Sequence, residues 1–144
     1  MRPPGPPLGR ELARTAKAVG RAFNGALVEA GGSLPIWLVL SSLKGEQWRT
    51  QHELARAVGI EGPTLTRHLD SLERAGLVVR RRDPSDRRAV QVELTAAGHA
   101  LHAQLLEAVI AFNRRLHAGL TKQEIDALRH ALARLEENVR EVLQ

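Results

Sequence analysis

Residues 50–95 constrain the fold of this chain more than any other segment, because their pattern predicts two short helices followed by a β-hairpin. Thr50 and Glu53 have the spacing of a capping box, which predicts that the first helix begins at Thr50. Gly59 can adopt a positive φ and end that helix, and Pro63 suits the first turn of the next. A helix–turn–helix followed by a hairpin wing is an arrangement that places one helix in the major groove of DNA.

The second of these helices has one apolar stripe and one polar face. Leu65, Leu69 and Leu72 recur at spacings of four and three residues, which predicts a single buried side. The opposite face carries groups that can bond base edges or phosphates. We therefore predict a recognition helix with DNA contacts from Pro63, Thr64, Thr66, Arg67 and, at the edge of the face, His68, with Asp70 also facing outward. An ordinary helical hairpin with a solvated polar face would show the same stripe.

A hairpin with an arginine-bearing loop is predicted next. The pattern indicates strands over 77–82 and 90–94, the second with Val90, Val92 and Leu94 on its inner face. The loop predicted between them, 83–89, is longer than most hairpins need. Residues 80–88 hold five arginines against two aspartates, and arginines at a loop tip can enter a minor groove. The alternative is a solvated run of charges.

The segment DPSDRRAVQVELT at 83–95 resembles the wing of the MarR family of winged-helix bacterial regulators, with its Asp-x-Arg…Leu-Thr pattern. The segment GPTLTRHLDSLERAGLVVRRRD at 62–83 is similar to the family's recognition helix and first wing strand. The chain departs from the family pattern at Glu61, where a small polar residue is common at the entry to the recognition helix. The resemblance is strongest over about 35–95 and extends more weakly along nearly the whole chain.

This resemblance implies that Arg88 enters the minor groove and that Asp86 orients it, with Arg87 as an additional basic neighbour. The wing residues predicted to contact DNA are Arg82, Asp86, Arg87 and Arg88. It also implies a homodimer that represses transcription and is released by a small aromatic or phenolic effector. By position, Phe23, Trp37 and Phe112 are candidates to line an effector pocket, and core packing is the alternative for all three.

The predicted fold is mainly α with a small β-wing. It comprises a disordered Pro/Gly-rich tail at 1–9, an N-terminal dimerisation helix at 10–32, a winged helix-turn-helix domain at 33–95 and C-terminal dimerisation helices at 96–144. The last helix has a heptad-like seam formed by Ile125, Leu128, Leu132, Leu135, Val139 and Val142. The spacing leaves open whether this seam folds back on the preceding helix or packs against a second copy. The resemblance implies the second copy.

Composition limits the partners and the chemistry. The net charge of +5 weakly favours a polyanion such as double-stranded DNA, and residues 96–144 contribute none of this surplus. The absence of cysteine excludes a thiol switch, a disulfide and a Cys-ligated metal, and is consistent with a cytoplasmic protein. No apolar run approaches the length of a membrane span. No catalytic or phosphate-binding motif is present, so we expect neither an enzyme nor a cofactor.

We therefore predict a homodimeric, sequence-specific regulator, with repression as the expected sign, that binds a pseudo-palindromic operator with half-sites about one helical turn (~10 bp) apart. One alternative is a metal-responsive regulator of the same fold, since His99 and His102 lie at i, i+3, although the expected metal-ligand set is incomplete and we predict no metal site. Another alternative is an adaptor that uses the winged helix to contact protein. The arginine-bearing wing argues against the adaptor.

Overall fold

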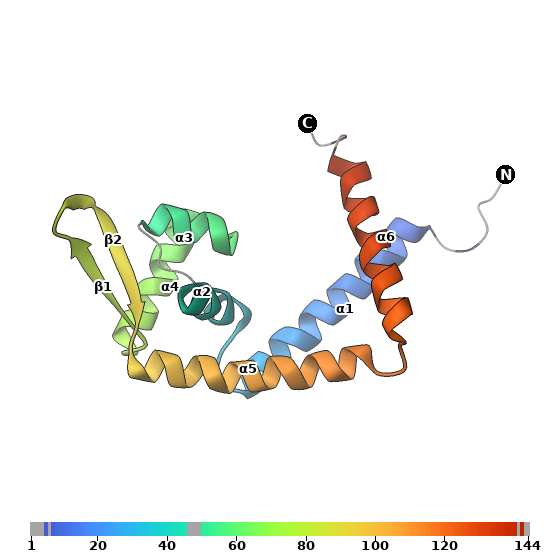
Figure 1. The fold of residues 1–144 in the computed structure, drawn as a ribbon, viewed down its shortest axis with the longest axis horizontal. Coiled ribbons are helices and arrows are strands. Elements are labelled where there is room, and N and C mark those ends of the chain that lie inside the picture. The colour runs from blue at the N-terminus through green and yellow to red at the C-terminus, as the bar shows by residue number, and fades with distance from the viewer. Residues whose placement is uncertain (1–4, 6, 46–49, 141, 143–144) are drawn as a thin grey trace. The chain divides into compact units, whose positions relative to one another are not determined.

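The computed structural model describes residue 5 and residues 7–45, 50–140 and 142, and gives only the backbone at 83 and 86–88. Its elements are α1 Leu8–Glu29, α2 Leu34–Gly45, α3 Gln51–Val58, α4 Gly62–Arg74, β1 Val78–Asp83, β2 Asp86–Leu94, α5 Ala96–His117 and α6 Lys122–Arg140 (Figure 1). They confirm the predicted class, mainly α with a two-stranded antiparallel wing. The chain divides into two compact units, residues 1–110 and 111–144.

No single helix in the described part of the chain is long and apolar enough to cross a membrane. Taken together, α1 and α2 meet the requirements of length and composition, but they are bent by 76° at the break between them.

Threonine side chains begin three of the helices, and the one at Thr50 was predicted. Thr50 Oγ1 accepts a hydrogen bond from the Glu53 N–H at 3.1 Å at the start of α3. Thr95 and Thr121 play the same part for α5 and α6, each with a 3.1 Å bond from the N–H three residues on. Each bond satisfies an N–H that has no partner within its own helix. Gly59, at φ 75°, ends α3 in the left-handed conformation expected of it.

Two predicted boundaries were wrong. The first helix begins at Leu8 rather than at residue 10, because the Pro7 carbonyl accepts hydrogen bonds from the Arg10 and Glu11 N–H groups, both at 3.1 Å. Leu8 and Gly9 are therefore helical and do not belong to a disordered tail. The rest of that predicted tail, 1–4 and 6, lies outside the described residues, as does the very short strand suggested at 46–49.

The predicted seven-residue wing loop, 83–89, is also wrong. The ladder pairs Arg82 with Val90 and Asp83 with Asp86, so only Pro84 and Ser85 lie between the strands. The shift in register between these two pairs is an irregularity that accommodates the additional residues of β2. Extending the ladder gives main-chain groups hydrogen-bonding partners that an open loop would leave to water.

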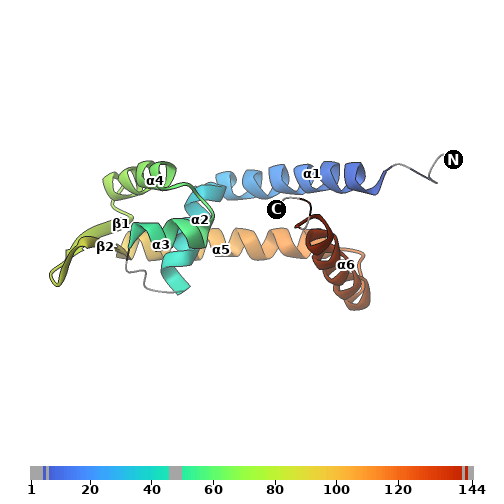
Figure 2. The same cartoon turned by 90° about the horizontal axis from the view of Figure 1, so that it is seen from above.

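The hydrophobic core lies in the unit formed by residues 1–110. Its fully buried leucines come from five helices and are Leu27, Leu40, Leu54, Leu65, Leu69 and Leu105. The predicted stripe of α4 is confirmed, since Leu65, Leu69 and Leu72 are all buried. On β2, Val92 is buried and its inner-face neighbours Val90 and Leu94 are half-buried. The hairpin lies beside α4 at the edge of this unit (Figure 2).

A close approach of backbones joins α4, the wing and α5. The Leu77 carbonyl accepts the Thr95 N–H at 3.1 Å, and the Thr95 hydroxyl donates to the Gly76 carbonyl at 2.5 Å. Gly98 on α5 packs directly over the same Leu77 peptide, where a Cβ atom would lie 2.1 Å from the carbonyl oxygen. Only glycine fits at residue 98 without a shift of the backbone.

Replacing Gly98 with alanine should therefore lower the free energy of unfolding by about 1–3 kcal/mol, because the added methyl group overlaps a main-chain carbonyl. Denaturant unfolding followed by circular dichroism measures this change. The matched control is Gly62→Ala in α4, where a Cβ atom would have no neighbour within 4 Å and stability should change by about 0.5 kcal/mol or less. Equal stability of the Gly98 variant and the wild type would contradict this account of the joint.

Candidate nucleic-acid interface

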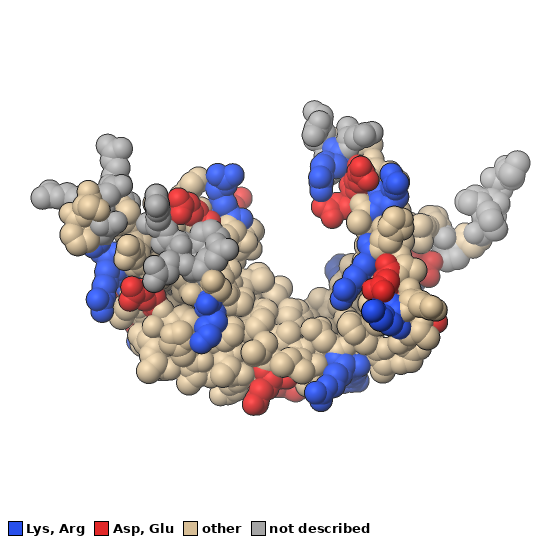
Figure 3. Space-filling view, in the orientation of Figure 1, with Lys and Arg blue, Asp and Glu red and all other residues tan. Residues whose placement is uncertain are grey.

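The structure places all five predicted recognition residues on α4, outside its buried leucine stripe. Pro63, Thr66 and Arg67 are exposed, and Thr64 and His68 are half-buried. Glu61 precedes the helix without a side-chain cap bond, as its poor capping ability leads one to expect. In Figure 3, basic and acidic side chains both lie over the part of the molecule that holds α3, α4 and the wing. The exposed polar face of α4 can therefore reach a ligand without rearrangement of the core.

The hydroxyl of Thr66 is already committed on two sides. It donates to the Gly62 carbonyl at 3.0 Å and accepts from Gln51 Nε2 at 3.4 Å. With its proton used inside the helix, Thr66 can offer DNA only an acceptor, which suits the amino group of adenine or cytosine. Gln51 was missed by the sequence analysis because its proximity to Thr66 depends on how α3 packs on α4.

Arg80 is one of the five arginines at 80–88, yet its side chain bonds to α4. The guanidinium of Arg80 donates to Asp70 Oδ1 at 2.5 Å and to Glu73 Oε2 at 3.2 Å. The main-chain N–H of Arg80 also donates to Glu73 Oε2, at 3.1 Å. The hydrogen bond from Arg80 holds the pKa of Glu73 below its usual value, and the same bond raises the pKa of Arg80. Asp70 faces outward as expected, with a side chain that is 44% exposed, but its carboxylate also pairs with the wing strand.

The next two arginines of β1 differ from Arg80. Arg81 and Arg82 are exposed, opposite Gln91 and Val90 in the ladder. The backbone at 86–88 belongs to β2, while the side chains of Asp86, Arg87 and Arg88 lie outside the described part of the structure. The wing contacts proposed for these three residues therefore stay predictions.

The three candidate effector residues do not all belong to one unit. Phe23 and Trp37 are half-buried and pack against the core of the first unit. Trp37 also stacks on His102 of α5, with ring centroids 5.3 Å apart and planes inclined by 15°. Phe112 is half-buried and lies in the second unit, 111–144.

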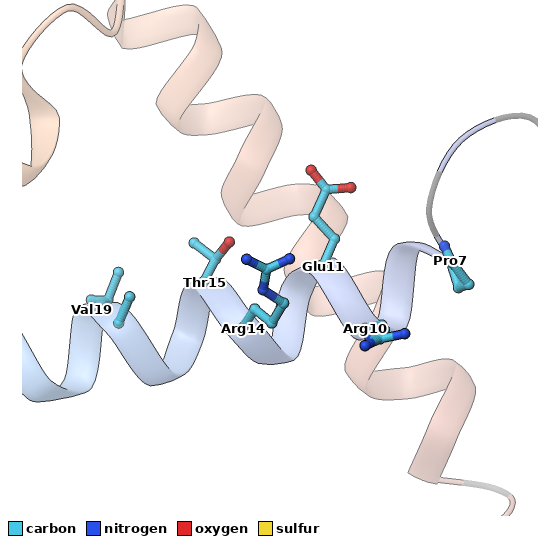
Figure 4. A pocket seen from close by; sticks show the side chains of 7 residues that line it. Pro7, Arg10, Glu11, Arg14, Thr15 and Val19 are labelled. Carbon is cyan, nitrogen blue, oxygen red and sulfur yellow. The ribbon is translucent and has the colours of Figure 1, made fainter.

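Two hollows in the surface have other linings. One, of about 630 Å³, is lined by Pro7 and by residues from successive turns of α1, of which Figure 4 labels Arg10, Glu11, Arg14, Thr15 and Val19. The other, of about 420 Å³, lies where the end of α2 meets β2 and the first turn of α5, and includes Lys44 and His99.

The two histidines suggested as a metal-ligand pair have different surroundings. His102 is buried against Trp37, and burial, followed by the charges of Lys44 and His99, lowers its pKa. His99 is exposed, with its Nδ1 atom 3.0 Å from Lys44 Nζ. Within the described residues, no three His, Cys, Asp or Glu side chains form a group that could hold a metal ion.

The chain is similar to known proteins both in sequence and in structure. The sequence model of the MarR family matches residues 33–90, which span α2 to the first half of β2. The transcriptional repressor CouR, in a structure bound to a 23-mer DNA duplex, is 34% identical, with a TM-score of 0.81 over 90% of this chain and 92% of that one.

Two further structures show relatives with partners. A mutant MarR from E. coli complexed with operator DNA is 30% identical, with a TM-score of 0.78 over 90% of this chain and 93% of that one. CouR from Rhodococcus jostii RHA1 bound to p-coumaroyl-CoA is 30% identical, with a TM-score of 0.72 over 87% of this chain and 88% of that one. With its recognition helix, its wing and this degree of identity across nearly its full length, the chain belongs to the MarR family of DNA-binding transcriptional regulators.

Proposed function

We propose that this protein is a homodimeric repressor that acts in the cytoplasm, binds a pseudo-palindromic operator and is released by a small-molecule effector. The observation that carries the proposal is the exposed polar face of α4 beside an arginine-bearing wing, held on a buried leucine stripe. Two relatives of similar length have been determined with DNA bound. Recognition is non-covalent, and the proposal assigns the protein no enzymatic step.

Each recognition residue has a role suited to its chemistry. Arg67 reaches guanine O6 and N7 as a bidentate donor, and Thr66 accepts from a base amino group. The methyl group of Thr64 touches a thymine methyl, while Pro63 and His68 border the contact. Arg82 and Arg87 neutralise phosphates, and Arg88, oriented by Asp86, enters the adjacent minor groove, where the potential is most negative.

Unburied apolar side chains support the homodimer. No described residue of α6 is buried, and the seam residues Leu128, Leu132 and Val139 are 52%, 39% and 55% exposed. On α1, Leu8 and Val28 are 62% and 55% exposed. Each of these two helices exposes enough apolar side chain to favour a covering partner, and a second copy would provide one. Two recognition helices related by a two-fold axis would then read an inverted repeat.

The effector is expected to be a small aromatic or phenolic molecule. CouR, a relative of this chain, has been determined with an aromatic thioester, p-coumaroyl-CoA. In this chain, Trp37 and His102 bring aromatic faces to the junction of α2 with α5, and Phe23 packs against the same core. A ligand at this junction would shift the DNA-binding lobes if it bound one arrangement of the dimer more tightly than the other. Phe112, in the other unit, stays a separate candidate for ligand contact.

Selection of bound sequences from random duplex DNA, at near-physiological salt, tests the proposed function. An enriched inverted repeat with half-sites about one helical turn apart would support a dimeric, sequence-reading regulator. Folded, dimeric protein that enriches no sequence would contradict it.

Arg67→Ala should weaken binding to the selected duplex by about 1–3 kcal/mol, because a bidentate base contact is lost. Fluorescence anisotropy with the selected duplex and a scrambled duplex of equal composition measures both affinities. The affinity for the scrambled duplex should change little. Equal losses on both duplexes would make Arg67 a phosphate contact. Arg129→Ala, which removes the same charge from α6, is the control.

The pair of substitutions Leu128→Lys and Leu132→Lys should convert the dimer into a monomer, because charges placed in an apolar interface cannot be paired there. Sedimentation equilibrium measures the mass in solution. The matched control is Gln123→Lys with His130→Lys, which adds the same side chains to exposed positions outside the seam. A seam variant that sediments as a dimer would place the interface elsewhere.

A further inference from the structure

Arg80 differs from its neighbours on β1 in what its side chain contacts. Its side chain is 21% exposed and bonds two carboxylates of α4, whereas Arg81 and Arg82 are exposed. Glu73 accepts three times from Arg80, from the main-chain N–H, from Nε and from the far guanidinium nitrogen at 3.4 Å. A guanidinium held by two carboxylates in this way has few donors left for DNA.

The two carboxylates come from one side of the recognition helix. Asp70 and Glu73 are three residues apart on α4, so they lie on neighbouring turns of the same face. A two-stranded hairpin has little stability of its own, so its contacts with the rest of the unit, those with α4 among them, set its orientation. The turn between α4 and β1 includes Gly76 at φ 75°, a residue type that by itself permits many backbone conformations. The bonds from Arg80 restrict this freedom.

Asp70 and Glu73 are also unfavourably charged for a surface that approaches DNA. Each carboxylate beside a phosphate backbone opposes binding, because affinity rises with the positive charge placed there. Their side chains are 44% and 42% exposed, so burial does not remove their charge from the interface. A positioning role explains why they lie on the recognition helix at all.

We propose that Arg80, Asp70 and Glu73 are positioning residues that hold the wing at a fixed angle to the recognition helix, so that base contacts from α4 and wing contacts form together. This inference rests on the proposed function and concerns how specificity is produced. Arg80 belongs to the scaffold of the interface, and the wing arginines available to DNA are those that follow it in the sequence.

Whether Glu73→Gln weakens or strengthens DNA binding distinguishes a positioning role of Glu73 from a purely electrostatic one. Removing a negative charge near DNA should strengthen binding to every duplex if charge alone matters. If Glu73 holds Arg80, the same change should weaken binding to the selected duplex by about fivefold, the upper end expected for a partly exposed ion pair. Affinity for the scrambled duplex should stay equal or rise, because the guanidinium is released.

Four variants complete the experiment. Asp70→Asn should act like Glu73→Gln. Glu61→Gln is the matched control, since it removes an exposed carboxylate at the start of α4 that makes no side-chain cap bond, and it should not weaken binding. Arg80→Gln should weaken binding to the selected duplex without changing the slope of log affinity against log salt. A protein that carries both Arg80→Gln and Glu73→Gln should bind the selected duplex with the same affinity as the Arg80→Gln variant.

Several outcomes would overturn the inference. Wild-type or tighter binding of the selected duplex by Glu73→Gln and Asp70→Asn would leave electrostatics as the sole role of these carboxylates. A salt slope reduced by about one in Arg80→Gln would make Arg80 a phosphate contact. Thermal unfolding of each variant identifies loss of fold. If Arg80→Gln does not fold, the affinities of Glu73→Gln and Asp70→Asn still test the inference. Selection that enriches no duplex defeats the proposed function and this inference together, whereas failure of the sign test defeats the inference alone.

Discussion

Burial of the leucine stripe of α4 is the interaction on which the rest of the interface depends. Leu65 and Leu69 are fully buried and Leu72 is 3% exposed. Each such burial stabilises the fold by about 1.5–3 kcal/mol, far more than any single polar contact on the opposite face of the helix. The helix therefore remains attached to the core through its apolar side, and its polar side is free to vary without unfolding the domain. This division allows one scaffold to carry different DNA-reading residues.

The wing is attached to this helix by polar contacts and by a close approach of backbones. Arg80 joins β1 to α4 through two carboxylates, while Thr95 and Gly98 hold the start of α5 against the Leu77 peptide. The recognition helix, the wing and the first turns of α5 therefore share one joint.

The scarcity of aromatic residues limits the places where an aromatic ligand could stack on this chain. Aromatics make up 3% of the chain, and the stack of Trp37 on His102 lies between α2 and α5. An aromatic ligand would find there a polarisable surface of the kind that favours stacked or edge-to-face contacts. The buried histidine lies at the same junction, and its lowered pKa favours the neutral ring that stacks on Trp37.

The sequence by itself determined the features that depend on short-range chemistry. The helix start at Thr50 followed from cap spacing, and the buried side of α4 followed from the period of its leucines. The family resemblance could be identified because the motifs at 62–95 are contiguous in the sequence. The polar face of α4 was predicted as the side opposite its periodic leucines.

Tertiary structure decided the features that join residues from different elements. The pairing of Asp70 and Glu73 with Arg80, the approach of Gln51 to Thr66 and the packing of Gly98 over Leu77 follow no periodic pattern in the sequence. Likewise the wing loop was predicted too long, because strand pairing between Asp83 and Asp86 depends on how the two strands meet. Local propensity records the preference of each segment alone, whereas these contacts are set by the angles and distances at which packed segments meet.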